Sequence, residues 1–217
     1  MPGSVNRQRT DARTERWREH KLALRREFVD AAFRALAEHG PEVSMDEIAA
    51  EAGTVKPKLY RHFAAKSDLA GAVSERMGEI LWQRLLPNMN LRDAPRVTIR
   101  RGLEAYVNVV DEYPNVFKFL MRTDSEPLME SGKEIAGVIA NVLKEFLSAT
   151  DLDAELADPS AYAVVGAVGA ATEWWMRTRT MPKDKFVTHL ATMTWGALDA
   201  VLREQGITLD PDRAVEL

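Results

Sequence analysis

Residues 44–69 read SMDEIAAEAGTVKPKLYRHFAAKSDL, which we interpret as two short helices joined by a turn. Ser44 is followed three residues later by Glu47, the spacing of a capping box, in which each side chain satisfies a backbone N–H at a helix start. Gly53 supplies the left-handed conformation that a sharp turn needs, and Thr54 is then expected to cap a second helix. The pattern predicts one helix from Ser44 to the turn and another directly after it.

The second helix has the composition of an element that contacts DNA. Pro57 falls in its first turn, where the missing N–H costs little. Lys56 and Lys58 place cations at its start, and an aromatic and histidine cluster closes it. Two helices joined by such a turn, the second offering lysines to a groove, match the docking geometry of a DNA-reading helix-turn-helix.

The charge of the chain is distributed unevenly. The 217 residues carry a formal net charge of −4, which taken alone argues against a nucleic-acid binder. Residues 1–70, however, contain 13 Lys and Arg against 11 Asp and Glu, and residues 1–26 contain 8 against 3. We therefore expect one end of the chain to meet phosphate, and a basic arm over residues 1–20, with Arg7, Arg9, Arg13, Arg16 and Arg18, to be either a flexible DNA-binding segment or a solvated terminus.

Apolar residues at helical spacing run through the rest of the chain, and no alternating strand pattern interrupts them. Helices are predicted up to Gly40, from about Ser67 to Pro87, from Pro95 to Tyr113 and over 115–122. Three longer ones follow, the first opening at 125–127, the second running from Asp158 to about Arg179 and the third from Pro182 to near Gly206. We predict an all-α protein of about nine helices, with a three-helix DNA-binding domain over 21–68 and a regulatory domain over 69–217.

Three segments resemble the tetracycline-repressor family of bacterial regulators: FVDAAFRALAEHG at 28–40, DEIAAEAG at 46–53 and LYRHFAAKSDL at 59–69. The chain departs from the family where the reading helix begins, because residues 54–58 read TVKPK and the family usually has valine-serine-lysine-glycine-threonine before Leu-Tyr. The resemblance implies DNA contacts, with Tyr60, His62 and Lys66 on phosphates. The full set of expected DNA-binding residues is Ser44, Thr54, Val55, Lys56, Pro57, Lys58, Tyr60, His62 and Lys66.

The resemblance also implies a homodimer and an effector cavity. Ala163, Gly166, Ala167 and Ala170 form a stripe that allows close helix approach, and Leu190, Met193, Ala197 and Val201 give the last helix an apolar seam. From the residues alone, this surface fits an internal contact as well as a second subunit. Aromatic and methionine side chains suit a long apolar effector, with an acyl compound favoured and a hydrophobic cation as the rival. The expected ligand-binding residues are Trp82, Leu86, Met89, Tyr106, Val110, Phe117, Leu120, Met121, Val142, Phe146, Gly169 and Trp174.

Several other classes find little support in the sequence. The chain has no cysteine, its four histidines lie in unlike contexts, and no metal-ligand or nucleotide-binding pattern occurs, so we expect neither an enzyme, a metal site nor a cofactor. No signal peptide or membrane span is apparent, which predicts a cytoplasmic protein without a membrane partner. The expected function is a ligand-responsive regulator, most simply a repressor on a near-palindromic operator. The alternative is a helical carrier of small hydrophobic molecules that does not bind DNA.

Overall fold

The computed structural model describes residues 4–88, 93–123, 126–149 and 154–214. These residues form nine α-helices and two short 3-10 helices, with no strand among them, which confirms the predicted all-α class. The contacts divide the chain into two units. The first, here the N-terminal unit, comprises Met1–Val73 and Asn115–Ser125, and the second, the C-terminal unit, comprises Ser74–Pro114 and Glu126–Leu217.

The N-terminal unit contains α1 (Ser4–His39), α2 (Met45–Glu51), α3 (Lys56–Tyr60), the start of α4 (Lys66–Leu85) and most of α6 (Pro114–Arg122). Burial of apolar side chains from all five helices holds it together, since each such side chain contributes about 1.5–3 kcal/mol when fully removed from water. The buried core includes Phe28, Ala32, Leu36, Val43, Ile48, Leu59, Phe63, Leu69, Val73, Phe119 and Leu120.

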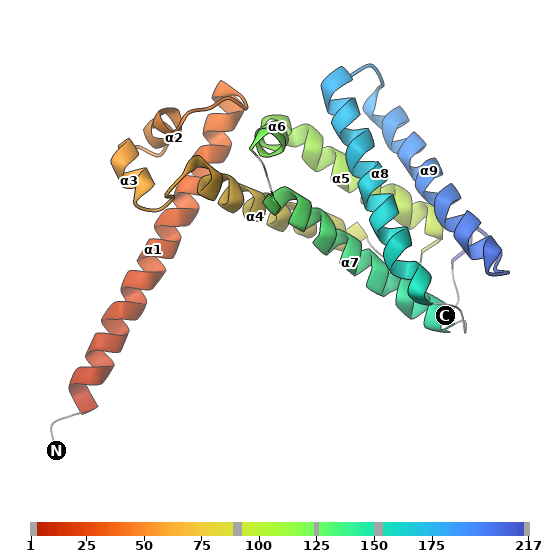
Figure 1. The fold of residues 1–217 in the computed structure, drawn as a ribbon, viewed down its shortest axis with the longest axis horizontal. Helices are drawn as coiled ribbons and strands as arrows, with labels where there is room; N and C mark the ends of the chain where they lie inside the picture. Colours follow the sequence, from red (N-terminus) through yellow and green to blue (C-terminus); the bar gives the residue numbers. More distant parts are fainter. Residues whose placement is uncertain (1–3, 89–92, 124–125, 150–153, 215–217) are drawn as a thin grey trace. The chain divides into compact units, whose positions relative to one another are not determined.

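The long α1 changes the expectation for the N-terminal arm. The helix is continuous from Ser4 to His39, so residues 4–20 extend α1 and do not form a separate flexible segment (Figure 1). Its core-facing side begins at Phe28, and Trp17 and Leu22 before that point are 65% and 54% exposed. Strong helix formers along this stretch explain how the helix continues beyond the core.

The inclusion of α6 in the N-terminal unit was not predicted. From the sequence, the DNA-binding domain is expected to end at residue 68 and all later residues to belong to the second domain. The Asn115 side-chain amide donates to the carbonyl of Leu36, the residue three before the end of α1, at 3.0 Å. Arg122 forms an ion pair with Glu42 in the loop before α2. These polar contacts attach both ends of α6 to segments more than 70 residues earlier.

The C-terminal unit consists of the rest of α4, α5 (Pro95–Glu112), α7 (Glu126–Ala149), α8 (Ala157–Thr178), α9 (Lys183–Glu204) and the 3-10 helices Leu86–Asn88 and Ala154–Leu156. Within it α5 packs on α9, α7 on α8, and α8 on α9 (Figure 1). The α8–α9 turn is fixed by Trp175, which stacks on Phe186 at 5.1 Å between ring centroids and donates to the Met181 carbonyl at 2.8 Å. Arg179 and Lys183 beside this turn both pair with Asp111 of α5.

Candidate DNA-binding surface

The start of α2 is held by the predicted capping box. The backbone N–H of Glu47 donates to Ser44 Oγ at 3.2 Å, and the backbone N–H of Ser44 donates to Glu47 Oε2 at 2.7 Å. The hydrogen bonds from Ser44 lower the pKa of the Glu47 carboxyl, because they stabilise its charged form. Ser44 is thus engaged in fixing α2, and its place among the DNA-binding residues remains a prediction.

The turn follows the sequence closely except at one residue. Gly53 has φ +60°, as a left-handed turn requires, and the Thr54 N–H donates to the Ala49 carbonyl at 2.9 Å. The N-cap of α3 is Val55, which has extended backbone and makes no side-chain cap hydrogen bond, so the expectation that Thr54 caps this helix was wrong. The turn uses Thr54 to complete its own hydrogen bonds, which delays the helix start by one residue.

The short α3 separates a buried anchor from an exposed face. Leu59 is fully buried, and Phe63 just after the helix is 1% exposed. All residues from Val55 to Tyr60 except Leu59 are exposed, and the exposed fraction is 66% for Val55 and 41% for Tyr60. An exposed valine and two lysines at the start of a helix are groups that contact thymine methyls, guanine edges and phosphates in the major groove. The exposed set is Val55, Lys56, Pro57, Lys58 and Tyr60.

Lys56 has a partner that could not be predicted from the sequence. Its ammonium donates to Asp46 Oδ2 in the first turn of α2 at 2.7 Å, and this hydrogen bond raises the pKa of Lys56. Both side chains are largely exposed, so water and DNA can compete for the pair. The carboxylate therefore lies directly beside the cation that is expected to meet the groove.

Lys66, at the start of α4, is also engaged within the protein. Its ammonium donates to the Val43 carbonyl at 2.6 Å and lies 5.4 Å from the centre of the Phe119 ring of α6. The ammonium has three donors, of which Val43 uses one. A phosphate contact by Lys66 stays a prediction, and the structure adds a tie between α4, the loop before α2 and α6.

A second group of cations lies where α1 passes the end of α3. Arg25 donates to the His62 carbonyl at 2.9 Å, and its guanidinium lies 4.3 Å from the centre of the Phe63 ring. The His62 ring meets Phe28 edge-on at 5.1 Å, and its Nδ1 is buried without a hydrogen-bond partner. Burial, followed by the positive charges of Lys21, Lys58, Arg25 and His20, lowers the pKa of His62. His62 is therefore neutral near pH 7.

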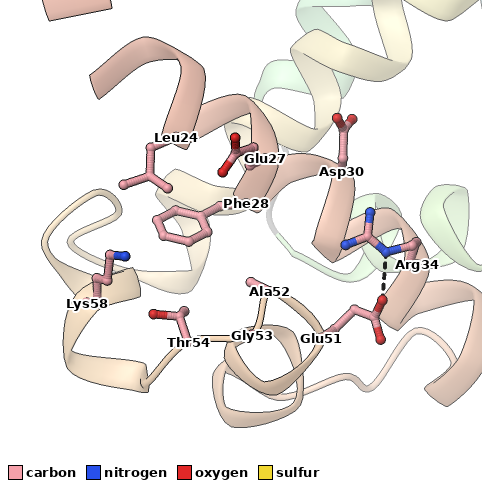
Figure 2. A pocket seen from close by; sticks show the side chains of 10 residues that line it. All are labelled: Leu24, Glu27, Phe28, Asp30, Arg34, Glu51, Ala52, Gly53, Thr54 and Lys58. Atoms are coloured by element: carbon pink, nitrogen blue, oxygen red, sulfur yellow. Dashed lines mark hydrogen bonds and ion pairs between the residues drawn. The ribbon is translucent and has the colours of Figure 1, made fainter. Parts of the chain in front are cut away.

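A concavity of about 340 Å³ lies between α1 and the turn of the motif (Figure 2). Phe28 and Leu24 form one side of it, Thr54 and Lys58 another, and Arg34 pairs with Glu51 at 2.6 Å (Figure 2). Glu27 and Asp30 also line it, so its charged lining consists of three carboxylates and two cations. It differs in position and in character from the apolar effector cavity that the sequence predicts.

The predicted ligand-binding residues fall into both units. Val110 of α5 is buried, while Tyr106, Trp82, Val142 and Gly169 are half-buried. The Tyr106 hydroxyl is hydrogen-bonded to the Thr172 side chain, and desolvation raises its pKa.

The remaining members of that set are less uniform. Leu86 and Trp174 are 59% and 40% exposed, and the buried tryptophan of α8 is the neighbouring Trp175. The N-terminal unit contains three further members, of which two are buried and one exposed: Phe117, Leu120 and Met121. Met89 lies outside the described residues, as does the side chain of Phe146.

The fold and this surface define an all-helical protein with a helix-turn-helix whose reading helix is exposed along one face. Comparison with known proteins identifies the class more closely. Residues 28–73 match the family described as bacterial regulatory proteins, tetR family, and residues 85–208 match the tetracyclin repressor-like C-terminal domain. An uncharacterised HTH-type transcriptional regulator of Mycobacterium tuberculosis is 34% identical over 207 residues, covering 91% of this chain and 87% of that protein.

Further similarities agree with these matches. The HTH-type transcriptional activator FasR of Mycolicibacterium smegmatis is 27% identical, with 87% of this chain and 85% of that protein covered. A TetR-family regulator from Streptomyces coelicolor has a TM-score of 0.69 at 21% identity, covering 84% of this chain and 83% of the other. The fatty acid degradation regulator FadR from Bacillus halodurans has a TM-score of 0.62 at 18% identity, covering 81% and 96%.

The chain belongs to the TetR family of transcriptional regulators. This membership confirms the predicted class, and it assigns the protein to DNA-binding regulators and not to enzymes or to carriers without a DNA-binding role. None of the described helices combines the length and apolar character that a bilayer span requires.

Proposed function

We propose that this regulator is a homodimeric repressor that binds a near-palindromic operator and is released from it by a hydrophobic, lipid-like effector. The observation that carries the DNA half of the proposal is the exposed face of α3, where Val55, Lys56, Lys58 and Tyr60 surround the buried anchor Leu59. A helix anchored on one side and polar on the other can enter a major groove without disturbing its own packing.

The exposed faces of α8 and α9 support a dimer. Ala163, Gly166, Ala167 and Ala170 are all exposed, and Trp174 continues the same face. A Cβ added at Gly166 would meet nothing within the chain, yet glycine inside an exposed helix costs about 1 kcal/mol relative to alanine. Close approach of a second backbone explains why small residues occupy these positions.

The part of α9 that can belong to the proposed dimer surface is smaller than the sequence indicated. Met193 is 62% exposed and Ala197 is exposed, whereas Leu190 is 5% exposed and packs inside the protomer. Leu190 is therefore a core residue, and the proposed dimer surface on α9 consists of Met193, Gly196, Ala197 and Ala200. Two subunits paired through these faces would present their reading helices about 34–36 Å apart, one turn of DNA.

The oligomeric state tests this part directly. Ala167→Arg should place a charge in the proposed interface and shift the protein from dimer to monomer in sedimentation equilibrium. Ala23→Arg, on the exposed side of α1, is the matched control and should leave the dimer intact. A monomeric native protein, or an Ala167→Arg variant that dimerises as well as the native one, would contradict the proposed interface.

A lipid-like effector is supported by the character of the C-terminal unit and by one structural neighbour. The half-buried and buried side chains of α5 and α8 are mainly apolar, with the Tyr106–Thr172 pair as a polar point among them. Ligand sites are commonly apolar with few polar groups. FadR from Bacillus halodurans is described as a regulator of fatty acid degradation, which makes acyl compounds the first class to test.

The decisive experiment joins operator and effector. Genomic fragments captured by the purified protein would give the operator, and mass spectrometry of co-purified molecules would give effector candidates. If the effector binds a state that fits DNA poorly, it must weaken operator affinity by a factor of about 5 to 150, and operator must weaken effector affinity equally. Equal operator affinity with and without every acyl compound that binds would refute the induction mechanism.

Activation of transcription, in place of repression, is also supported by one relative. FasR of Mycolicibacterium smegmatis is described as a transcriptional activator. Transcription in vitro from a captured promoter, with and without the protein, separates the two: a repressor lowers the yield of transcript, and an activator raises it.

A further inference from the structure

A hydrogen bond between two hydroxyl groups bridges α5 and α8 in the C-terminal unit. It joins the Tyr106 side chain of α5 to the Thr172 side chain of α8. Within this unit α5 packs closely on α9, and α8 packs on α7 and α9, whereas α5 and α8 do not pack closely on each other over their described lengths. The two hydroxyl groups therefore meet across a space that the helix backbones leave between them.

The inward side of α8 is incompletely buried beside this bond. Val165 and Val168 lie on the same side of the helix as Thr172, because residues four and seven apart share a face. Thr172 is buried, and so is Ala161, one turn before Val165 on that side, yet Val165 and Val168 between them are only half-buried. Their accessible surface therefore faces the interior of the unit.

The side of α5 that carries Tyr106 shows the same feature. Tyr106 lies one turn before the buried Val110 on this side of the helix, but is itself only half-buried. A Cβ added at Gly102, one turn before Tyr106, would meet nothing within 4 Å. Desolvation nevertheless raises the pKa of the Tyr106 hydroxyl, and no charged side chain contributes to this shift. The hydroxyl group thus borders open space inside the unit, in apolar surroundings.

The direction of the hydrogen bonds decides what this pair offers to a ligand. Thr172 donates its only hydroxyl proton to the Val168 carbonyl at 2.7 Å. Its oxygen must then accept the bond from Tyr106, because a hydroxyl group has one proton to donate. The Tyr106 proton is therefore also used within the protein, and the Tyr106 oxygen keeps free capacity only as an acceptor.

This arrangement discriminates against a carboxylate. An ionised carboxylate has lone pairs and no proton, so it finds no donor at the Tyr106 oxygen. Its charge would also be buried without a counter-charge at this point, which is far more costly than burying a neutral polar group. A neutral group that carries a proton has neither disadvantage.

We propose that Tyr106, oriented by Thr172, selects an uncharged effector that donates a hydrogen bond, namely a long-chain lipid with a hydroxyl or an amide N–H group at its buried end. Long-chain alcohols and acyl amides belong to this class. The inference rests on the proposed function and names the chemistry of its hydrophobic effector. Tyr106 is the binding residue, and Thr172 is a positioning residue because it acts through Tyr106.

Three probes with the same number of non-hydrogen atoms test the selection in the native protein. Dodecanol donates and accepts, the methyl ether of undecanol only accepts, and undecanoate is a charged acceptor. Their affinities would be measured by titration of the intrinsic tryptophan fluorescence at pH 8. A neutral hydrogen bond corresponds to a factor of roughly two to ten in affinity. We expect dodecanol to bind more tightly than the ether by that factor, and undecanoate to bind most weakly.

Two variants distinguish this role from a merely structural one. Tyr106→Phe should lower the affinity for dodecanol by roughly two- to tenfold, to that of the ether, and leave the affinity for the ether nearly unchanged. Thr172→Val frees the Tyr106 proton to meet a ligand, so the ether should gain affinity by a similar factor and the preference for the alcohol should disappear.

Thr178→Val is the matched control. Thr178 also donates to the carbonyl four residues earlier, that of Trp174 at 3.0 Å, but from the exposed end of α8. Its replacement should leave all three affinities unchanged. Urea unfolding shows whether each variant is folded, and the preference of the native protein tests the proposal even where a variant is not.

Four outcomes would overturn the assignment: equal affinities of the native protein for dodecanol and the ether, tighter binding of undecanoate than of dodecanol, a preference for dodecanol that survives in both folded variants, or no binding of any probe. Failure of the proposed function has a different signature. An anionic effector that releases the operator would refute the selection by Tyr106 and leave induction intact. The expected order of affinities with unaltered operator binding would refute induction and leave the selection intact.

Discussion

Asp46→Asn provides a sharp test of how the reading helix distinguishes sequences. In the native protein the Asp46 carboxylate holds the Lys56 ammonium at 2.7 Å, so the cation is partly neutralised before DNA arrives. A guanine edge and a phosphate must both displace the carboxylate from Lys56, but a complex with unrelated DNA depends almost entirely on phosphate contacts and has no base contacts to offset that loss. We therefore expect Asp46 to suppress non-specific binding.

The magnitude follows from the exposure of the pair. The two side chains are 44% and 65% exposed, and ion pairs of this kind change equilibria by a factor of roughly 1.5 to 5. Asp46→Asn should tighten binding to a scrambled duplex by that factor, and it should steepen the salt slope on that duplex by about 0.9, because Lys56 becomes free to neutralise one phosphate. The operator should gain less, so the ratio of specific to non-specific affinity should fall.

Fluorescence anisotropy with operator and scrambled duplexes at several salt concentrations measures the affinity for the scrambled duplex, its salt slope and the ratio of specific to non-specific affinity. Glu38→Gln removes an equal charge from an exposed position on α1 and serves as the control. In a Lys56→Met background, Asp46→Asn should lose most of its effect. An unaltered specificity ratio, or an effect that persists without Lys56, would refute the reasoning.

Three further predictions concern stability and the effector. Ser44→Ala removes the capping box and should lower the free energy of unfolding by about 1 kcal/mol in urea denaturation, while an unchanged midpoint would contradict the role of the cap. The pKa of His62 is lowered in the folded protein, so as the pH falls the unfolded chain binds a proton at this residue before the folded protein does. The free energy of unfolding should therefore decrease as the pH drops below about 6.5, and His62→Gln should remove that part of the pH dependence. An increase in the free energy of unfolding over this pH range would show the sign to be wrong. Gly169→Trp fills space in the half-buried part of α8 and should abolish effector binding with operator affinity retained; undiminished effector affinity in calorimetry would exclude this position from the cavity.

Features set by neighbouring residues were predictable from the sequence. The capping box at Ser44, the positive φ of Gly53 and the position of Pro57 in the first turn of α3 all depend on contacts within a few residues, and the structure confirms them. Thr54 was wrongly predicted to be the N-cap of α3. Whether Thr54 or Val55 takes this position depends on which backbone hydrogen bonds the turn forms. That choice depends on the backbone of Ala49, five residues away.

Features set by packing were less accessible. Trp174 and Trp175 are adjacent and equally apolar, yet a 100° step around α8 leaves one exposed and buries the other. Leu190 fits the apolar pattern of α9 equally well whether that side of the helix packs on α5 or on a second subunit. The Lys56–Asp46 pair and the cluster of Arg25 with His62 join residues 10 and 37 positions apart, and only the folded arrangement brings them together. The one available signal was the i, i+4 spacing of Lys21 and Arg25 ahead of the core of α1.

The placement of α6 limits how the DNA-binding part of this protein can be separated or exchanged. The chain leaves the N-terminal unit after Val73 and returns to it from Asn115 to Ser125, so the unit is discontinuous in sequence. A fragment ending at residue 73 would expose the apolar surface that buries Phe119 and Leu120 and would leave the Leu36 carbonyl and the Lys66 ammonium without their α6 partners. Recombination that joins the first 73 residues to another regulatory domain would therefore succeed only if the new partner supplies a matching sixth helix.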